Sequence, residues 1–179
     1  MFPILQTERF LLREIVQEDR NRVFEGLSNP EVIKYYGVSY STLEATQLQM
    51  EWFKDLFQNS RGIWWGICEP AKPQLLLGAC GFNSWTQEHK RAELGYWLLP
   101  DYWRKGIMKE CLPVIIRHAF LTMKIHRIEA MVETENENSM KLLESLRFQR
   151  EGTLQDYEVK NGRFISLHYY ARLGGAITP

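Results

Sequence analysis

The sequence predicts one mixed α/β (α+β) domain over residues 1–179. Three observations lead to this fold class. Apolar residues follow helical spacing in some segments, and alternate or run continuously in others. Three strand-like segments between residues 62 and 98 are separated by short turn-rich stretches, which is typical of an antiparallel meander. Further along, a strand, a helix and a strand follow one another, which predicts a parallel crossover.

The composition is that of a packed globular protein, with 45% hydrophobic and 13% aromatic residues. The 22 basic side chains balance the 22 acidic ones, so the charge predicts neither nucleic acid nor an anionic membrane as a partner. No apolar run approaches the roughly 20 residues of a membrane span, and the first residues do not resemble a signal peptide. We therefore expect a cytoplasmic protein.

The cysteines and histidines predict no special chemistry. The cysteines are Cys68, Cys80 and Cys111, and the histidines are His89, His118, His126 and His168. Each cysteine lies in an apolar stretch and none forms a CxxC pair, so we expect buried, reduced thiols. The histidines lack the spacing of metal ligands, and we expect no metal site.

The N-terminal part begins with a strand and three helices. Residues 7–15 alternate as a strand does, and residues 18–27 carry apolar positions at helical spacing. Asn29 and Pro30 predict the start of a short helix, as N-cap and first helical residue. Ser41 and Glu44 fit a capping box, which predicts an amphipathic helix from there to about residue 57.

The middle of the chain carries the meander and the crossover. We expect antiparallel strands over residues 62–68, 75–82 and 91–98. A helix is expected over residues 109–123, with a kink or an irregular turn at Pro113. The strand after the crossover is expected over residues 126–132.

The C-terminal part predicts a helix and a hairpin. A helix starts at Asn136, and strands follow over residues 148–159 and 164–173. The dipeptide Asn161-Gly162 between those strands is typical of a type I′ turn. With these two, the sheet has about seven strands, most of them antiparallel.

The turn between the third meander strand and the crossover helix predicts an anion site. A helix N-terminus leaves about four backbone N–H groups unpaired and carries roughly half a positive charge. Gly106 lets the backbone approach an anion closely, and Arg104 and Lys105 add positive charge. We expect the backbone N–H groups from Arg104 to Met108 to hold the pyrophosphate of a nucleotide-containing cofactor.

Four segments in this order and spacing resemble the GNAT family of acetyl-CoA-dependent N-acetyltransferases, and more closely its RimJ/RimL-like subgroup, which acetylates N-termini of ribosomal proteins. They are Thr7-Glu8-Arg9-Phe10-Leu11-Leu12-Arg13, Ala92-Glu93-Leu94-Gly95-Tyr96-Trp97-Leu98, Tyr102-Trp103-Arg104-Lys105-Gly106-Ile107-Met108, and Asn136-Glu137-Asn138-Ser139 with Leu143-Glu144-Ser145-Leu146-Arg147-Phe148. The resemblance implies acetyl-CoA as co-substrate, no metal, and helices on both faces of the sheet. It also implies a gap for the pantetheine arm, where the strand ending near Leu98 splays from its parallel neighbour beside a bulge in that strand.

The chain departs from the family pattern at four positions. The phosphate motif has Trp103 and Met108 where the family has Gln or Arg and Gly or Ala. Leu143 stands where many members carry a tyrosine that acts as general acid. Arg147 stands where the later helix usually ends in glycine, and a left-handed backbone there would cost about 1 kcal/mol.

The resemblance implies two groups of site residues. The cofactor contacts are Leu98, Leu99, Arg104, Lys105, Gly106, Ile107, Met108 and Asn136. Asn136 also suits a helix cap. Glu93, a carboxylate in an otherwise apolar strand, is the candidate base, although a strand carboxylate can also be paired or face solvent. Ser139 is the candidate donor to the departing sulfur, with tyrosines of the last hairpin as alternatives. These are Tyr157, Tyr169 and Tyr170.

The expected acceptor is a primary amine, first of all the N-terminal α-amine of a ribosomal or other protein. A small amine such as a polyamine, amino acid or aminoglycoside is the alternative, and a catalytically silent CoA-binding sensor is another. A polycationic acceptor needs an acidic cleft, for which Glu44, Glu51, Asp55, Glu88 and Asp156 are available. Whatever the acceptor, its site is expected between the N-terminal helices and the last hairpin, with Trp52, Trp64, Trp65 and Trp85 as candidates for an aromatic wall. The protein is expected to be a monomer or a homodimer.

Overall fold

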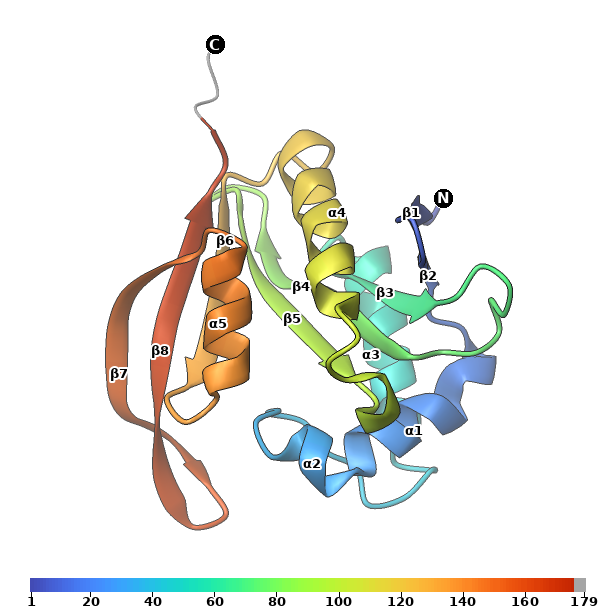
Figure 1. The fold of residues 1–179 in the computed structure, drawn as a ribbon, viewed down its shortest axis with the longest axis horizontal. Coiled ribbons are helices and arrows are strands. Elements are labelled where there is room, and N and C mark those ends of the chain that lie inside the picture. Colours follow the sequence, from blue (N-terminus) through green and yellow to red (C-terminus); the bar gives the residue numbers. More distant parts are fainter. Residues whose placement is uncertain (176–179) are drawn as a thin grey trace.

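The computed structural model describes residues 1–175 and contains one eight-stranded sheet in the order β1-β2-β3-β4-β5-β6-β8-β7. The strands are β1 (Leu5–Gln6), β2 (Leu11–Glu14), β3 (Ile63–Cys68), β4 (Gly78–Thr86), β5 (Arg91–Leu98), β6 (Arg127–Glu133), β7 (Gln149–Lys160) and β8 (Arg163–Leu173). The helices are α1 (Arg20–Ser28), α2 (Pro30–Ile33), α3 (Gln47–Gln58), α4 (Ile107–Leu121) and α5 (Glu137–Ser145), with 3₁₀ turns at Gln17–Asp19 and Pro100–Tyr102. The mixed α/β class is therefore confirmed, with one strand more than expected (Figure 1).

The sheet has a separate hydrophobic core on each face. Side chains of α4 and α5 belong to one core, together with Trp65 of β3. Side chains of α1, α2 and α3 belong to the other, together with the next residue back along the same strand, Trp64. Successive strand residues point to opposite faces, so the helices cover both sides of the sheet, as expected.

The N-terminal strand is shorter than predicted and is broken. The residues from Thr7 to Phe10 form a turn closed by the Thr7 N–H donating to the Phe10 carbonyl at 2.8 Å. The break separates β1 from β2, which pair antiparallel. The Thr7 hydroxyl also donates to Glu110 of α4, which ties this turn to the helix.

The third helix starts later than the capping box predicts. The helix α3 begins at Gln47, and neither Ser41 nor Glu44 caps it. Thr42 takes the local role instead, because its hydroxyl accepts from the Ala45 N–H at 3.1 Å and closes a turn before the helix. The predicted start at Asn29 is confirmed, because its side chain accepts from the Glu31 N–H.

The antiparallel meander of β3, β4 and β5 is confirmed, with β5 at its predicted bounds. The middle strand lies a few residues later than predicted. The pairing of β4 with β5 is regular from Gly78–Leu98 to Phe82–Leu94, and its register shift falls between Asn83 and Thr86. The extra residue is therefore in β4, where Ser84 has φ 53°, and the bulge expected in the strand that ends at Leu98 is not there.

The crossover is confirmed, because β5 and β6 are parallel and α4 connects them. Only three residue pairs join the two strands, Arg91–Arg127, Ala92–Ile128 and Glu93–Glu129. Beyond Glu93, β5 keeps pairing with β4 while β6 keeps pairing with β8, so the two strands diverge as the resemblance implies (Figure 1). The helix α4 runs without interruption through Pro113.

The C-terminal helix and hairpin agree with the prediction. Asn161 and Gly162 have φ 51° and 74°, as a type I′ turn requires. The three cysteines are free and buried, as expected. Within residues 1–175, no helix is both long and apolar enough to cross a membrane.

Candidate active site

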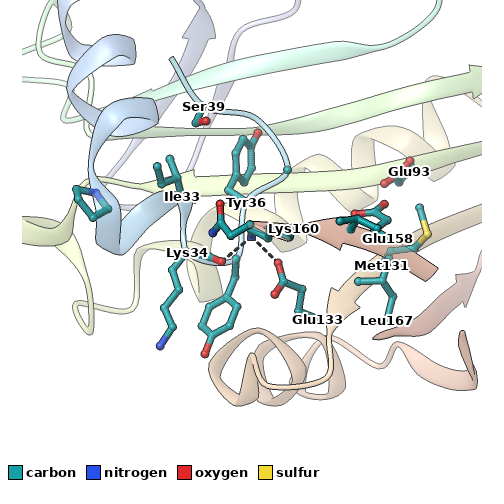
Figure 2. Close-up of a pocket in the computed structure, with 15 residues that line it drawn as sticks. Ile33, Lys34, Tyr36, Ser39, Glu93, Met131, Glu133, Glu158, Lys160 and Leu167 are labelled. Carbon is teal, nitrogen blue, oxygen red and sulfur yellow. Dashed lines mark hydrogen bonds and ion pairs between the residues drawn. The ribbon is translucent and has the colours of Figure 1, made fainter. Parts of the chain in front are cut away.

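A cavity of about 590 Å³ opens where β5 and β6 diverge. Its lining comes from α2 and the loop after it, from β5 and β6, and from the β7–β8 hairpin. Figure 2 shows Ile33 and Tyr36 on the α2 side, facing the acidic side chains of Glu93, Glu133 and Glu158. The cavity thus joins an apolar and aromatic wall to a wall of carboxylates.

Glu93 lies at the last residue pair before the strands part. Its carboxylate is half-buried and accepts a hydrogen bond from Asn83 Nδ2 at 3.1 Å. Burial raises the pKa of Glu93 above its ordinary value, and the neighbouring carboxylates of Glu129 and Glu158 raise it further. A carboxylate with a raised pKa on a cavity wall accepts a proton more readily than an ordinary glutamate does.

A lysine ammonium already occupies one corner of the cavity. Lys160 Nζ donates to Glu133 Oε1 at 2.6 Å and to the Lys34 carbonyl at 2.5 Å (Figure 2). Lys160 closes β7 and Lys34 follows α2, so this one side chain links the hairpin to the opposite wall. Glu133 and the Lys34 carbonyl thus bind the alkylammonium group of this chain's own Lys160.

Ser139 faces β5 across the divergence of the strands. Its Oγ lies 2.6 Å from the hydroxyl oxygen of Tyr96, which is a short hydrogen bond. Burial raises the pKa of Tyr96 to about 12, although the bond to Ser139 lowers it. Tyr96 therefore keeps its proton at neutral pH and can donate it to Ser139.

Asn136 is the N-cap of α5, because its Oδ1 accepts from the Ser139 N–H at 3.2 Å. This confirms the helix-cap role that the sequence also suggests. The cap fixes the first turn of α5 and with it the place of Ser139. The Nδ2 group of Asn136 makes no hydrogen bond within residues 1–175 and is available to an acceptor.

The predicted anion site is a tight turn that leads directly into α4. Gly106 is the N-cap with φ 75°, and Arg104 also has a left-handed backbone with φ 60°. Arg104, Lys105 and Gly106 are exposed, while Ile107 and Met108 are buried and direct the helix into the core. The exposed start of a 15-residue helix satisfies the geometric requirement for a phosphate site.

The end of β5 is held mostly by internal bonds. The Leu99 N–H donates to the Leu77 carbonyl, and the Leu99 carbonyl accepts from Tyr102. The indole N–H of Trp103 donates to the Leu98 carbonyl at 2.8 Å. Trp103, which departs from the family motif, therefore links the turn before α4 to the end of β5.

These features fit a bound acetyl-CoA. Gly106 carries no Cβ where the backbone must approach an anion, and no backbone atom lies within 4 Å of the place where a Cβ would stand. The unpaired sides of β5 and β6 offer backbone groups to the amides of a pantetheine arm. No group of three or more metal-ligating side chains lies close together among residues 1–175.

A family model shows which protein family this chain belongs to. The model of the acetyltransferase (GNAT) domain matches residues 9–149. The chain belongs to the GNAT acetyltransferase family. It is an acetyl-CoA-dependent N-acetyltransferase.

Relatives and solved structures agree with this assignment. The acetyltransferase is 38% identical over 172 residues to the uncharacterised N-acetyltransferase YoaA of Bacillus subtilis, covering 96% of this chain and 97% of YoaA. It is 28% identical over 119 residues to the [ribosomal protein uS5]-alanine N-acetyltransferase of Escherichia coli, covering 66% and 61% of the two chains. Its fold matches RimL, the ribosomal L7/L12 α-N-protein acetyltransferase, in complex with coenzyme A, with TM-score 0.86, 21% identity and 96% and 98% coverage.

The sequence did not predict all of the acetyltransferase's cavity. Glu133, Glu158 and Lys160 line it, and Tyr96 bonds to Ser139, although none of the four was singled out. The acidic residues suggested for the acceptor cleft do not line the cavity. They are Glu44, Glu51, Asp55, Glu88 and Asp156. Glu133 and Glu158 reach the same cavity as Glu93 only because of how β6 and β7 pair in the sheet. The register of those strands would have identified them.

The tryptophans suggested as an acceptor wall lie elsewhere. Trp64 and Trp65 are buried in the two cores, and Trp52 packs edge-on against Trp64. Trp85 lines a separate, smaller hollow. Tyr36, after α2, supplies the aromatic face of the cavity instead. Of the tyrosines named as alternative acids, Tyr170 donates to Glu144 and Tyr157 is exposed.

Proposed function

We propose that this acetyltransferase moves the acetyl group of acetyl-CoA to the α-amine of a protein N-terminus, with Glu93 as the base. The observation that carries the proposal is the position of Glu93. It lies on the wall of the amine-sized cavity and also at the residue pair where β5 and β6 begin to diverge. A group at that junction faces the acceptor and the reacting end of the cofactor arm together.

The cofactor would be held along one continuous path. The backbone N–H groups from Arg104 to Met108 would bind the diphosphate, Leu98 and Leu99 would flank the arm, and Asn136 Nδ2 would donate to one of its amide carbonyls. When bound, acetyl-CoA supplies a thioester whose acetyl group an amine can attack directly. The residues around this path need only place the arm and exclude water.

Glu93 and Ser139 would then move the protons. Glu93 accepts a proton from the incoming ammonium, directly or through one water. An α-amine has a pKa near 7.7–8.0, so roughly a tenth is already neutral at pH 7, whereas a lysine amine is almost fully charged. The raised pKa of Glu93 suits the α-amine. Ser139 Oγ would donate a proton to the departing thiolate, and Tyr96 would re-protonate Ser139 through their 2.6 Å hydrogen bond. The second proton that the attacking nitrogen loses then returns to Tyr96 through solvent, so the proton count balances.

The first experiment measures thiol release from acetyl-CoA with a panel of amines. Peptides with free N-termini should react, and the same peptides with a blocked N-terminus and an internal lysine should not. Reaction of the blocked peptides would contradict α-amine selectivity. Binding of coenzyme A without thiol release for any amine would favour the silent sensor.

The role of Glu93 is tested by the pH dependence of the rate. Glu93→Gln should slow the reaction most between the Glu93 pKa and about pH 8, where the wild type needs the base and neutral amine is scarce. Glu88→Gln, in an exposed turn, is the matched control and should leave the profile unchanged. An unaltered profile for Glu93→Gln would remove Glu93 from the mechanism.

A small polycationic amine is the second candidate, favoured by the carboxylates of the cavity. Glu133 already binds the Lys160 ammonium, and Glu158 forms no ion pair within residues 1–175. If a polyamine is the acceptor, Glu158→Gln should lower kcat/KM for polyamines and leave the value for peptides unchanged. The opposite pattern would assign Glu158 to the peptide.

A further inference from the structure

The turn that would bind the diphosphate is held from outside by the segment between β1 and β2. Arg9 of that segment donates from both Nη atoms to the Lys105 carbonyl, at 3.3 and 3.2 Å. No other side chain donates to that carbonyl within residues 1–175. Arg9 Nη2 also lies 3.6 Å from the place where a Cβ of Gly106 would stand.

Arg9 is itself held by a carboxylate in the first turn of α4. Glu110 Oε2 accepts from Arg9 Nε at 2.6 Å, and Glu110 Oε1 accepts from the Arg9 N–H at 2.8 Å and from the Thr7 hydroxyl at 2.6 Å. One carboxylate thus fixes both the backbone and the side chain of Arg9. The Arg9 side chain is 50% exposed. Its orientation is therefore fixed by these hydrogen bonds and not by packing in the core.

The peptide bond between Lys105 and Gly106 relates the position of Arg9 to the direction of the Gly106 N–H. The chain has no cis peptide bonds within residues 1–175, so the Lys105 carbonyl and the Gly106 N–H point in opposite directions. A charged donor on the carbonyl therefore directs the Gly106 N–H away from Arg9. It also polarises the peptide, which makes that N–H a stronger donor.

The turn needs such support because its backbone is not a preferred one. Arg104 adopts φ 60°, which costs an ordinary residue free energy and persists only where neighbours enforce it. The exposed residues Arg104 and Lys105 bury no side chain that could do so. Trp103 holds the start of the turn through its bond to the Leu98 carbonyl, and the bonds from Arg9 to the Lys105 carbonyl restrain the end that leads into α4.

We propose that Arg9, held by Glu110, is a positioning residue that fixes the Lys105–Gly106 peptide and directs the Gly106 N–H into the diphosphate site. The inference rests on the proposed binding of the cofactor diphosphate at this turn. Arg9 acts through the peptide and not by its charge alone, so a lysine in its place does not substitute for it. A lysine has a single nitrogen and cannot hold Glu110 and the Lys105 carbonyl in the same fork geometry.

The experiment measures dissociation constants by calorimetry for coenzyme A and for 3′-dephospho-coenzyme A, which keeps the diphosphate. Arg9→Lys should weaken both by at least about tenfold and by the same factor, the size expected for one charge-assisted hydrogen bond. Pantetheine, which has no phosphate, should bind the variant and the wild type equally. Arg22→Lys is the matched control, because Arg22 also donates to a carbonyl, that of Leu76, away from the site.

A second measurement follows the Gly106 amide by NMR. In the wild type its signal should move downfield when coenzyme A is added, and in Arg9→Lys the shift should be much smaller. Circular dichroism and the melting temperature show that each variant is folded. Equal affinities of Arg9→Lys and the wild type for coenzyme A, or a weakening for coenzyme A that is absent for the dephospho form, would overturn the role of Arg9.

The variant Gly106→Val separates this inference from the proposed cofactor site. A β-branched residue at φ 75° distorts the turn directly. If Gly106→Val weakens binding and Arg9→Lys does not, the diphosphate site stands and the positioning role fails. If neither changes the affinity, the cofactor does not use this turn and both fail.

Discussion

Glu93 combines two requirements that oppose each other. The carboxylate must be close to the cofactor gap, which means leaving water, and it must ionise to act as a base. Burial and the carboxylate of Glu129 both disfavour its charged form, and side-chain hydrogen bonds from Asn83 and Ser84 compensate only in part. The same residue is therefore expected to serve the reaction and to destabilise the fold.

This conflict predicts a gain of stability from Glu93→Gln that depends on pH. A carboxyl whose pKa is higher in the folded than in the unfolded chain contributes its full stability below the unfolded pKa, near 4.3. That contribution is lost as pH rises through the folded pKa. The variant should therefore unfold at higher denaturant concentration than the wild type at pH 7–8, and the difference should vanish below about pH 4. A constant difference at every pH would indicate altered packing instead.

Tyr96 and Ser139 are expected to act as one unit. Tyr96→Phe should reduce kcat about tenfold, because Ser139 loses the partner that orients and re-protonates its hydroxyl. Ser139→Ala should cost more, and the double variant should cost little beyond Ser139→Ala, since the two groups share one role. Tyr157→Phe, on an exposed part of β7, is the control. Additive losses for the pair would show two independent roles.

At the scale of elements, the end of α5 is a Schellman motif built without glycine. The Phe148 N–H donates to the Leu143 carbonyl and the Arg147 N–H to the Glu144 carbonyl, the pair of bonds that defines the motif. Arg147 adopts φ 64°, as the departure from the family glycine suggested. Leu143 and Phe148 are both buried, so their contact fixes the helix end against the core.

Arg147→Gly should therefore stabilise the fold by up to about 1 kcal/mol, because glycine adopts the left-handed backbone without steric cost. Urea denaturation of the variant should give a higher midpoint with an unchanged slope. Arg147→Ala is the control, since it removes the side chain and keeps the strain. An equal gain from alanine would assign the effect to removal of the repulsion between Arg147 and Arg172. Burial lowers the pKa of Arg172, and the charge of Arg147 lowers it further.

Elements set by local chemistry could be predicted, and those set by distant contacts could not. Asn29, Asn136 and Asn161-Gly162 act within three residues of themselves, and all behave as predicted. The first strand is broken at a turn that hydrogen bonds between Thr7 and Phe10 close, and the Thr7 hydroxyl also bonds to Glu110, about a hundred residues away. No local signal reveals that second contact. The exception among the local signals is the capping box at Ser41, which fails because the adjacent Thr42 closes a competing local turn before the helix.

The same distinction applies to the candidate site at the scale of the molecule. The turn around Gly106 and the caps of α5 are contiguous segments, and a family motif identifies them. The carboxylates of the cavity come from β5, β6 and β7, and they meet only because those strands diverge or pair in one register. A single sequence carries no measure of that register, so acidic residues outside the cavity seemed equally suitable.

The divided sheet predicts a pattern of hydrogen exchange. Residues 94–98 of β5 and 130–133 of β6 have no strand partner on the side facing the gap. Coenzyme A bound there should slow exchange of some of these amides beyond the general slowing that ligand binding gives to all of the core. Amides of β3, which is paired on both sides, report that general effect. Slowing confined to the start of α4 would mean that the arm does not enter the gap.

Trp103 gives the protein an optical signal at this place. Trp103 is 38% exposed and lies directly before Arg104, where the turn into α4 begins, and its indole N–H donates to the Leu98 carbonyl. Its fluorescence therefore depends on the polarity and the geometry of the proposed diphosphate site, whereas Trp64, Trp65 and Trp97 emit from the interior. Emission that changes with coenzyme A in the wild type and is silent in Trp103→Phe would report binding in real time without a label. Trp103 departs from the family motif, and this departure makes cofactor binding at the motif measurable by fluorescence.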